Sequence, residues 1–344
     1  MFSHRFFQIH IVVAVVRSAV AFTLFAACSF SALRPAWSQP NLSPAAKDTV
    51  VAKIGDQPIT RGEVDVLIRQ ALKGRALGAD ALAVLQAQAL SQAIDRRLIE
   101  AYLQREGQVL SEKEVDNEMD GLKADVKSKN RTWEQFLANT GMEEPELRRE
   151  VAWGRNWNRY LSRKIRDEQL QAHFDKHRRE YDGTELRVSH ILLRPARSGD
   201  PASVAELTKQ ARDIRRQIEA EEVSFAAAAQ KYSAGPSRRA DGDIGFIPRH
   251  GQMVEEFSRA AFALDKDQIS EPVITTFGVH LIRWTEEKPG TKKWNEVIEP
   301  LKTAVAQEFF EKLAEEERKT AKIEFTGGLP YFKPGTRELV IVPP

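Results

Sequence analysis

Two histidines lie inside short apolar segments and are the first candidates for a functional site. His190 lies within Val188-Ser189-His190-Ile191-Leu192-Leu193, and His280 lies within Phe277-Gly278-Val279-His280-Leu281-Ile282. Both segments have the composition of strands and are bounded by turn or helix signals. Because alternate side chains of a strand face opposite sides, the two imidazoles can face one layer from neighbouring strands. The pattern predicts a hydrogen-bonded pair, either as a core group or as the floor of a site.

The residues between the two histidines combine turn signals with an apolar pair at helical spacing. Gly242-Asp243-Ile244-Gly245 is turn and short-strand chemistry, without a phosphate-loop pattern. Met253 and Phe257 are four residues apart on a helix predicted over 253–263, so they share one face. Spacing alone makes this pair ordinary core.

Six segments in this order resemble the parvulin family of peptidyl-prolyl cis/trans isomerases. They are Ser189–Leu192, Lys231–Ser233, Gly242–Gly245, Gly251–Phe257, Glu271–Val273 and Phe277–Ile282. The resemblance covers 184–287 and implies an α+β domain with helices on a four-stranded, antiparallel-type sheet. It also implies rotation about X-Pro amides, which breaks no bond and therefore requires no nucleophile, metal or cofactor.

The resemblance assigns roles to particular side chains. His190 and His280 match the paired histidines of the family, and Thr275 matches a polar residue linked to them. The apolar cup for the proline ring is formed by Met253, Phe257 and Ile244.

The chain departs from the family at Gly235, where Asp or Cys is usual. Ser237 and Asp241 are the nearby polar residues that could substitute for it. In the same loop, Arg238 and Arg239 either are solvated or contact an acidic residue before the proline. Two hypotheses follow: an active isomerase that also holds unfolded clients, or a holdase whose isomerase domain only binds them.

Long amphipathic helices flank this stretch and must pack together or hold a client. They are predicted over 79–106, 111–129, 144–165 and 294–319. The segments Val50–Gly55 and Arg96–Gly107 resemble the N-terminal region of exported parvulin-like chaperones of the SurA and PrsA kind. That resemblance implies a helical chaperone domain over 39–183 and a C-terminal segment, 288–344, that packs back on it. Ile323–Phe325 is a candidate strand beside Val50–Ile54, and the tail from Gly327 is predicted to be unstructured.

The N-terminus has the features of a targeting signal. A weakly basic start precedes an apolar run from Ser18 to Leu33, and Ala36-Trp37-Ser38 offers a cleavage site. We expect a signal peptide over 1–38 and a periplasmic location; an uncleaved anchor and lipidation at Cys28 are the alternatives, and transient membrane association is compatible with this apolar start.

Charge and composition limit the partners. The net charge is +2, and no basic stripe accompanies the tryptophans, so no nucleic-acid partner is expected. The expected partners are unfolded or nascent exported polypeptides with X-Pro bonds. His173 and His177 have a spacing that can hold zinc, but their charged surroundings indicate a solvated helix face, and no metal is predicted.

Overall fold

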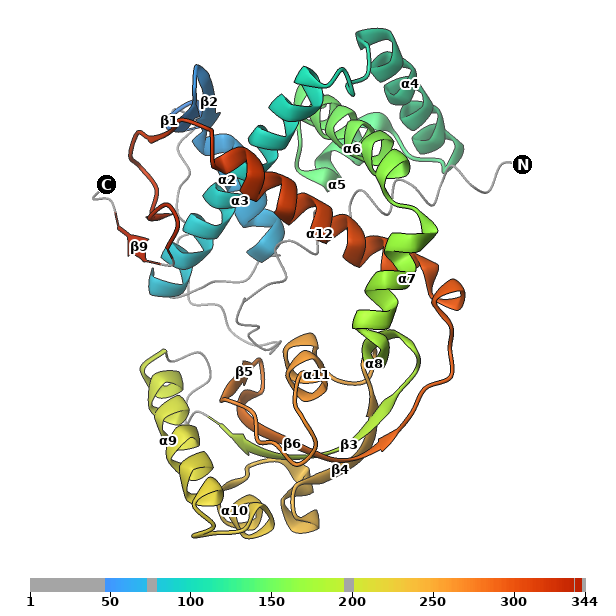
Figure 1. The fold of residues 1–344 in the computed structure, drawn as a ribbon. Helices are drawn as coiled ribbons and strands as arrows, with labels where there is room; N and C mark the ends of the chain where they lie inside the picture. Colours follow the sequence, from blue (N-terminus) through green and yellow to red (C-terminus); the bar gives the residue numbers. More distant parts are fainter. Residues whose placement is uncertain (1–46, 73–78, 195–200, 337, 342–344) are drawn as a thin grey trace. The chain divides into compact units, whose positions relative to one another are not determined.

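The computed structural model describes residues 47–72, 79–194, 201–336 and 338–341, and these fold into two compact units (Figure 1). The described part of the first unit consists of residues 47–72, 79–169, 302–336 and 338–341, and that of the second unit consists of residues 170–194 and 201–301. The predicted signal peptide, with Cys28 and Ser38, lies outside the described residues. Within those ranges, no helix combines the length and the apolar character needed to cross a membrane.

The second unit is built on a four-stranded antiparallel sheet with the strand order β4-β3-β6-β5 (Figure 1). The strands are β3 (Glu185–Leu193), β4 (Asp243–Pro248), β5 (Val273–Thr275) and β6 (Gly278–Lys288). The helices are α9 (Pro201–Glu219), α10 (Phe225–Tyr232), the short 3-10 helix η2 (Pro236–Ala240) and α11 (Glu255–Phe262). The predicted α+β arrangement with an antiparallel sheet is confirmed.

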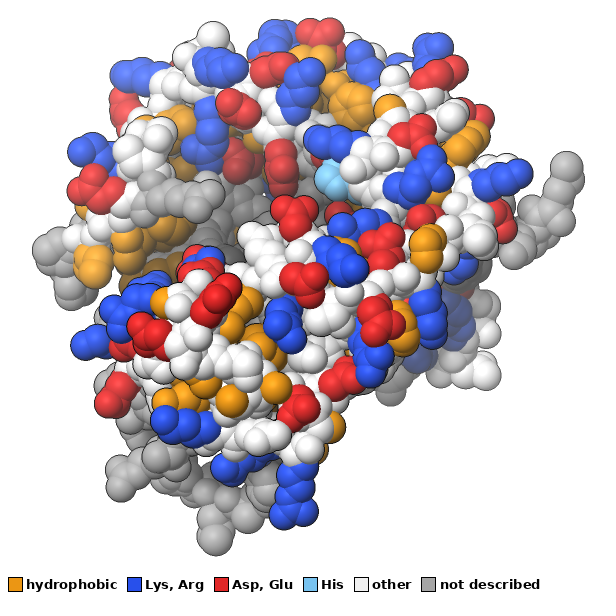
Figure 2. Space-filling view, turned by 60° about the horizontal axis from the view of Figure 1, so that its bottom comes forward, with side chains coloured by type: hydrophobic (Ala, Val, Ile, Leu, Met, Phe, Trp, Pro, Cys, Tyr) orange, Lys and Arg blue, Asp and Glu red, His pale blue; other side chains and the backbone are white. Residues whose placement is uncertain are grey.

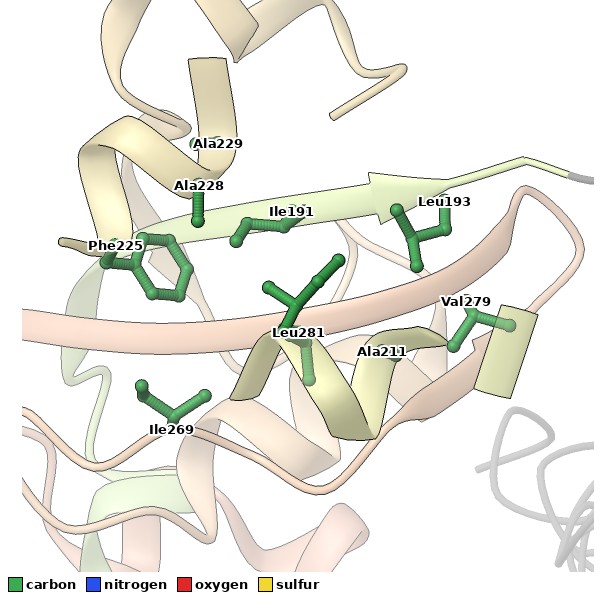
Figure 3. Packing of buried hydrophobic residues seen from close by; sticks show 10 residues of the cluster. Ile191, Leu193, Ala211, Phe225, Ala228, Ala229, Ile269, Val279 and Leu281 are labelled. Atoms are coloured by element: carbon green, nitrogen blue, oxygen red, sulfur yellow. The ribbon is translucent and has the colours of Figure 1, made fainter. Parts of the chain in front are cut away.

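The alternation of side chains along β3 and β6 creates two apolar layers. On one face, Ile191 and Leu281 pack with α9 and α10, and Figure 3 shows these two residues in the middle of the cluster, with Phe225 of α10 at its edge. On the other face, Val188 and Ile282 pack with α11. His190 pairs with Ile282 and His280 with Leu192 in the ladder between the two central strands. The parity of these positions puts both histidines on the α11 face.

The helix predicted over 253–263 begins later in the structure. α11 begins at Glu255, with Val254 as its N-cap, so Met253 precedes the helix and the argument from a shared helix face is wrong for it. Met253 still packs in the same apolar cluster as Phe257. The chain that enters the second unit forms α7 (Asp167–Lys176) and α8 (Arg178–Tyr181), which are separated by His177.

The chain enters and leaves the sheet of the second unit through a tight hydrogen-bonded contact. The Asp182 carboxylate accepts from the backbone N–H (2.9 Å) and the hydroxyl (2.7 Å) of Thr184. Thr184 Oγ1 in turn accepts from the N–H of Gly290 at 3.0 Å, and Lys292 donates its N–H to the Asp182 carbonyl at 2.9 Å. A Cβ on Gly290 would lie 2.2 Å from that carbonyl oxygen, so this contact requires glycine.

The first unit contains helices and a small sheet from both ends of the chain. Its helices are α2 (Arg61–Leu72), α3 (Ala79–Arg105), α4 (Glu112–Ser128), α5 (Trp133–Thr140) and α6 (Glu144–Lys164), and most of α12 (Ile298–Arg318) belongs to it. Strand β1 (Val50–Ile54) lies between β2 (Gln57–Thr60) and β7 (Ile323–Phe325). The register pairs Ala52 with Phe325, which confirms the predicted pairing of these two strands.

The core of the first unit explains the apolar stripes of its helices. Trp153 and Trp157 of α6 stack at 5.9 Å between ring centroids, and Phe310 of α12 meets both rings edge-on. These tryptophans are 5% and 3% exposed, so they are core residues and not a surface for ligands. The C-terminal tail differs from expectation, because β8 (Tyr331–Phe332) and β9 (Leu339–Val340) form a two-stranded pair.

Candidate active site

Three side chains of the second unit form a continuous hydrogen-bonded chain on the α11 face of the sheet. Thr275 Oγ1, at the end of β5, lies 2.8 Å from His280 Nε2 on β6. His280 Nδ1 lies 3.3 Å from His190 Nδ1 on β3. The two imidazoles stack at 5.4 Å between centroids. The structure therefore brings together the three polar residues that the sequence singled out.

The chain is buried, which keeps both histidines neutral. Thr275, His190 and His280 are 6%, 6% and 3% exposed. Phe257 is fully buried and meets both imidazoles edge-on, at 5.6 and 5.3 Å. Burial disfavours the charged form and lowers the pKa of His190 to about 4. The pKa of His280 falls to about 3, first through burial and then through the proximity of His190.

The direction of the hydrogen bonds is assigned starting from the Thr275 hydroxyl. Thr275 Oγ1 accepts the N–H of Phe277 at 3.1 Å. Its own proton can go to the carbonyl of Gly278 at 3.5 Å or to His280 Nε2 at 2.8 Å, and the shorter contact is the better hydrogen bond. With Thr275 assigned as the donor to His280 Nε2, His280 carries its proton on Nδ1 and donates it to His190 Nδ1, and the N–H of His190 is then assigned to Nε2.

That Nε2 atom is buried, has no hydrogen-bond partner among the described residues, and faces Gly235. A Cβ on Gly235 would lie 3.2 Å from His190 Nε2 and 3.3 Å from Ser233 Oγ. The backbone of Gly235 is extended (φ −77°, ψ 157°), a conformation open to any residue. Position 235 thus adjoins the end of the hydrogen-bonded chain, and this protein places no side chain there.

The Ser233 hydroxyl, which sequence reasoning missed, fixes this corner of the site. Ser233 is 2% exposed, and its Oγ accepts the backbone N–H groups of Leu192 at 3.1 Å and Gly235 at 3.2 Å. The available signal was its position as the C-cap of α10, directly before the loop.

The expected proline cup is only partly open. Ile244 and Met253 are partly exposed and pack on the apolar layer that contains Phe257. Phe257 itself lies beneath the surface, so it supports the histidines from below. Phe277, in the turn between β5 and β6, is 50% exposed and was not singled out from the sequence.

The charged residues of the loop are in different environments. Arg238 donates from Nε to the carbonyl of Gln230, and Asp241 accepts from the Gln230 side chain at 2.6 Å. Arg239 is exposed and forms no ion pair with a described residue.

Within the second unit, the rings of His173 and His177 stack at 4.6 Å, and His173 Nε2 lies 3.1 Å from the Tyr181 hydroxyl.

Comparison with known proteins places this geometry in a family. Residues 190–286 match the model of the PPIC-type PPIase domain, and residues 5–154 match that of the SurA-like N-terminal domain. The chain carries a parvulin-type isomerase domain and a SurA-like domain. The first of these matches begins at His190 and includes Gly235, Thr275 and His280.

Curated relatives carry foldase names. The chain is 37% identical over 135 residues to "Foldase protein PrsA" of Halalkalibacterium halodurans, which covers 39% of this chain and 36% of that protein. It is 26% identical over 286 residues to "Foldase protein PrsA" of Clostridium acetobutylicum, covering 76% and 82%. In the first relatives, the match thus spans little more than a third of the relative's length. A crystal structure of PrsA from Bacillus anthracis aligns with a TM-score of 0.36 at 24% identity, covering 67% of this chain and 95% of that one.

Proposed function

We propose that this protein is a peptidyl-prolyl cis/trans isomerase and folding chaperone for exported polypeptides. The observation that carries the proposal is the buried chain Thr275–His280–His190 on the α11 face of a parvulin-type sheet. Proposed clients are unfolded or nascent exported chains that contain X-Pro bonds. The SurA-like domain match and the foldase names of the relatives support the chaperone part.

Catalysis of this rotation needs no covalent step. The X-Pro amide must cross a barrier of about 18–20 kcal/mol set by its resonance. A site lowers the barrier when it fits the twisted amide better than either planar form. The neutral histidine pair provides a rigid, uncharged floor, because burial keeps the pKa of each ring well below neutral pH.

We assign the positioning of this floor to His190, His280 and Thr275, with Gly235 beside the buried Nε2 atom of His190 at its end. Ile244 and Met253 form the apolar wall for the proline ring, and Phe257 supports the wall and the histidines. Arg239, exposed and without an ion-pair partner among the described residues, is the better candidate of the two arginines for contact with an acidic residue before proline. Arg238 plays the smaller part, because its Nε already donates to Gln230.

The domain arrangement and location are part of the same proposal. We assign 1–38 to a signal peptide cleaved after Ser38, 39–183 to the N-terminal chaperone domain, 184–287 to the isomerase domain and 288–344 to a C-terminal segment that completes the chaperone domain. The protein would then act in the periplasm. On the face shown in Figure 2, Lys and Arg side chains are interspersed with Asp and Glu, which fits peptide clients better than a polyanion.

The decisive experiment measures cis-to-trans isomerisation of short X-Pro peptides by the purified mature protein, with Glu, Leu or Ala before proline. The expected result is a rate above the uncatalysed one, with a preference for Glu that Arg239→Gln removes. Lys231→Gln is the matched control, because Lys231 is exposed and this substitution also removes one positive charge from the same part of the chain. A folded protein without any turnover would overturn the isomerase assignment.

A second function is favoured by one specific observation. Gly235 leaves His190 Nε2 without a partner, so the domain could bind proline peptides and turn them over poorly. The protein would then be a holdase. Suppression of aggregation of an unfolded client, together with absent turnover, is the result that identifies this case.

A further inference from the structure

Within the part of the chain that the structure describes, two polar atoms of one loop region are buried without a hydrogen-bond partner. One is Nε2 of His190, a residue that is 6% exposed, and the other is Oγ of Ser237. A buried donor or acceptor without a partner destabilises the arrangement that buries it. In this arrangement of the loop, His190 Nε2 and Ser237 Oγ therefore remain able to form hydrogen bonds with a ligand.

The loop from Gly235 to Gly242 connects these two atoms. At its start, the Cβ position of Gly235 lies 3.2 Å from His190 Nε2. At its end, the N–H of Gly242 donates to the Ser237 carbonyl at 3.0 Å, and the Gly242 carbonyl accepts the N–H of His190 at 2.9 Å. Ser237 and His190 are thus joined through Gly242 by two backbone hydrogen bonds.

The ends of the loop are fixed more firmly than its middle. A Cβ on Gly242 would lie 2.6 Å from the His190 carbonyl oxygen, so the backbones of the loop and of β3 are in direct contact at Gly242. Residues 238–241 are exposed, and among the described residues the side chains of Arg238 and Asp241 form hydrogen bonds only with Gln230. Movement of the middle would uncover Ser237 without breaking the contact between Gly242 and β3.

We propose that Ser237 is a substrate-binding residue, and that its hydroxyl and the Nε2–H of His190 pair with the backbone of a bound X-Pro peptide when residues 238–241 move. This inference rests on the proposed function. The Nε2–H is a donor and fits a peptide carbonyl oxygen, while the hydroxyl can accept a peptide N–H or donate to a second carbonyl. The proposed ligand is the backbone of an extended peptide, and the side chains of that peptide contact other parts of the site.

The test uses the full-length mature chain and the blocked tetrapeptide Ala-Leu-Pro-Phe. Ser237→Ala is compared with Ser258→Ala, which removes another buried, unpartnered hydroxyl in the same unit, on α11. The readouts are the dissociation constant, the ¹⁵N resonance of His190 Nε2 during titration, and the unfolding temperature. Loss of one hydrogen bond is expected to weaken binding by Ser237→Ala about tenfold.

Both variants should keep or raise the unfolding temperature, because each removes an unsatisfied buried group. Only Ser237→Ala should weaken peptide binding, and the His190 Nε2 resonance of the parent protein should shift on titration. Unchanged affinity in Ser237→Ala, or a His190 resonance that does not respond to saturating peptide, overturns the inference.

The inference and the proposed function fail in different ways. Peptide binding that shifts the His190 resonance without turnover removes the isomerase assignment and leaves the role of Ser237 intact. Turnover that is the same in Ser237→Ala and the parent protein removes the role of Ser237 and leaves the isomerase assignment intact.

Discussion

Acidification should destabilise the isomerase unit through its buried histidine pair. In the unfolded chain a histidine has a pKa of about 6.5, whereas burial lowers the pKa of His190 to about 4 and that of His280 to about 3. Between these values the unfolded state binds more protons than the folded state. The stabilisation is therefore complete above pH 6.5 and is lost progressively as the pH falls toward 4.

The magnitude can be worked out at pH 5, where both folded-state rings remain neutral. An unfolded histidine is then protonated by about thirty to one, which is equivalent to about 2 kcal/mol for each ring. Protonation of the two histidines in the unfolded state should therefore lower the free energy of unfolding by about 4 kcal/mol between pH 8 and pH 5, which is a large part of the stability of a typical domain. Other groups also titrate in this range, so a variant is needed to isolate the pair.

His280→Asn provides that comparison, because asparagine retains hydrogen-bonding groups and does not titrate. The free energy of unfolding would be measured by hydrogen exchange of the buried amides of β3 and β6 in the full chain. His280→Asn should lose about 2 kcal/mol less than the parent protein between pH 8 and pH 5. Parallel pH profiles for the two proteins would refute the reasoning. At pH 8, His280→Ala should instead lower stability by about 1–3 kcal/mol, because His190 and Thr275 lose a partner.

Two glycine substitutions test the backbone contacts around the site. Gly290→Ala should destabilise the second unit by about 3 kcal/mol or more, because its Cβ would lie 2.2 Å from the Asp182 carbonyl. Thermal unfolding measures this, with Gly121→Ala as the control: beyond its chain neighbours and the adjacent backbone of helix α4, no described atom lies within 4 Å of that Cβ, so about 0.5–1 kcal/mol of stabilisation is expected. Gly235→Ala should fold and lose only about 1 kcal/mol, since its backbone is unstrained and the Cβ is 3.2 Å from His190 Nε2. Loss of the folded state in urea titration would show that position 235 requires glycine.

The sequence by itself determined the strands that carry the site and the pairing of the two histidines. Apolar runs around His190 and His280 specify central strands, and the alternation of side chains in strands puts both rings on one face. The link between Ile323–Phe325 and the first strand was also readable, because a short apolar segment after a long helix needs a sheet to join. These features follow from periodicity and composition, which are local properties of the chain.

Only the tertiary structure decided how the groups around the histidines are satisfied. Periodicity placed Met253 on a helix, but Val254 caps α11 and leaves Met253 before it, since the exact start of a helix depends on the cap. The absence of a side chain at Gly235 was visible in the sequence. In the structure, the Cβ position of Gly235 lies beside His190 Nε2, which has no partner among the described residues, and the same loop contains a second such atom, the Ser237 hydroxyl. This arrangement depends on contacts between residues far apart in the chain, which no local sequence pattern encodes.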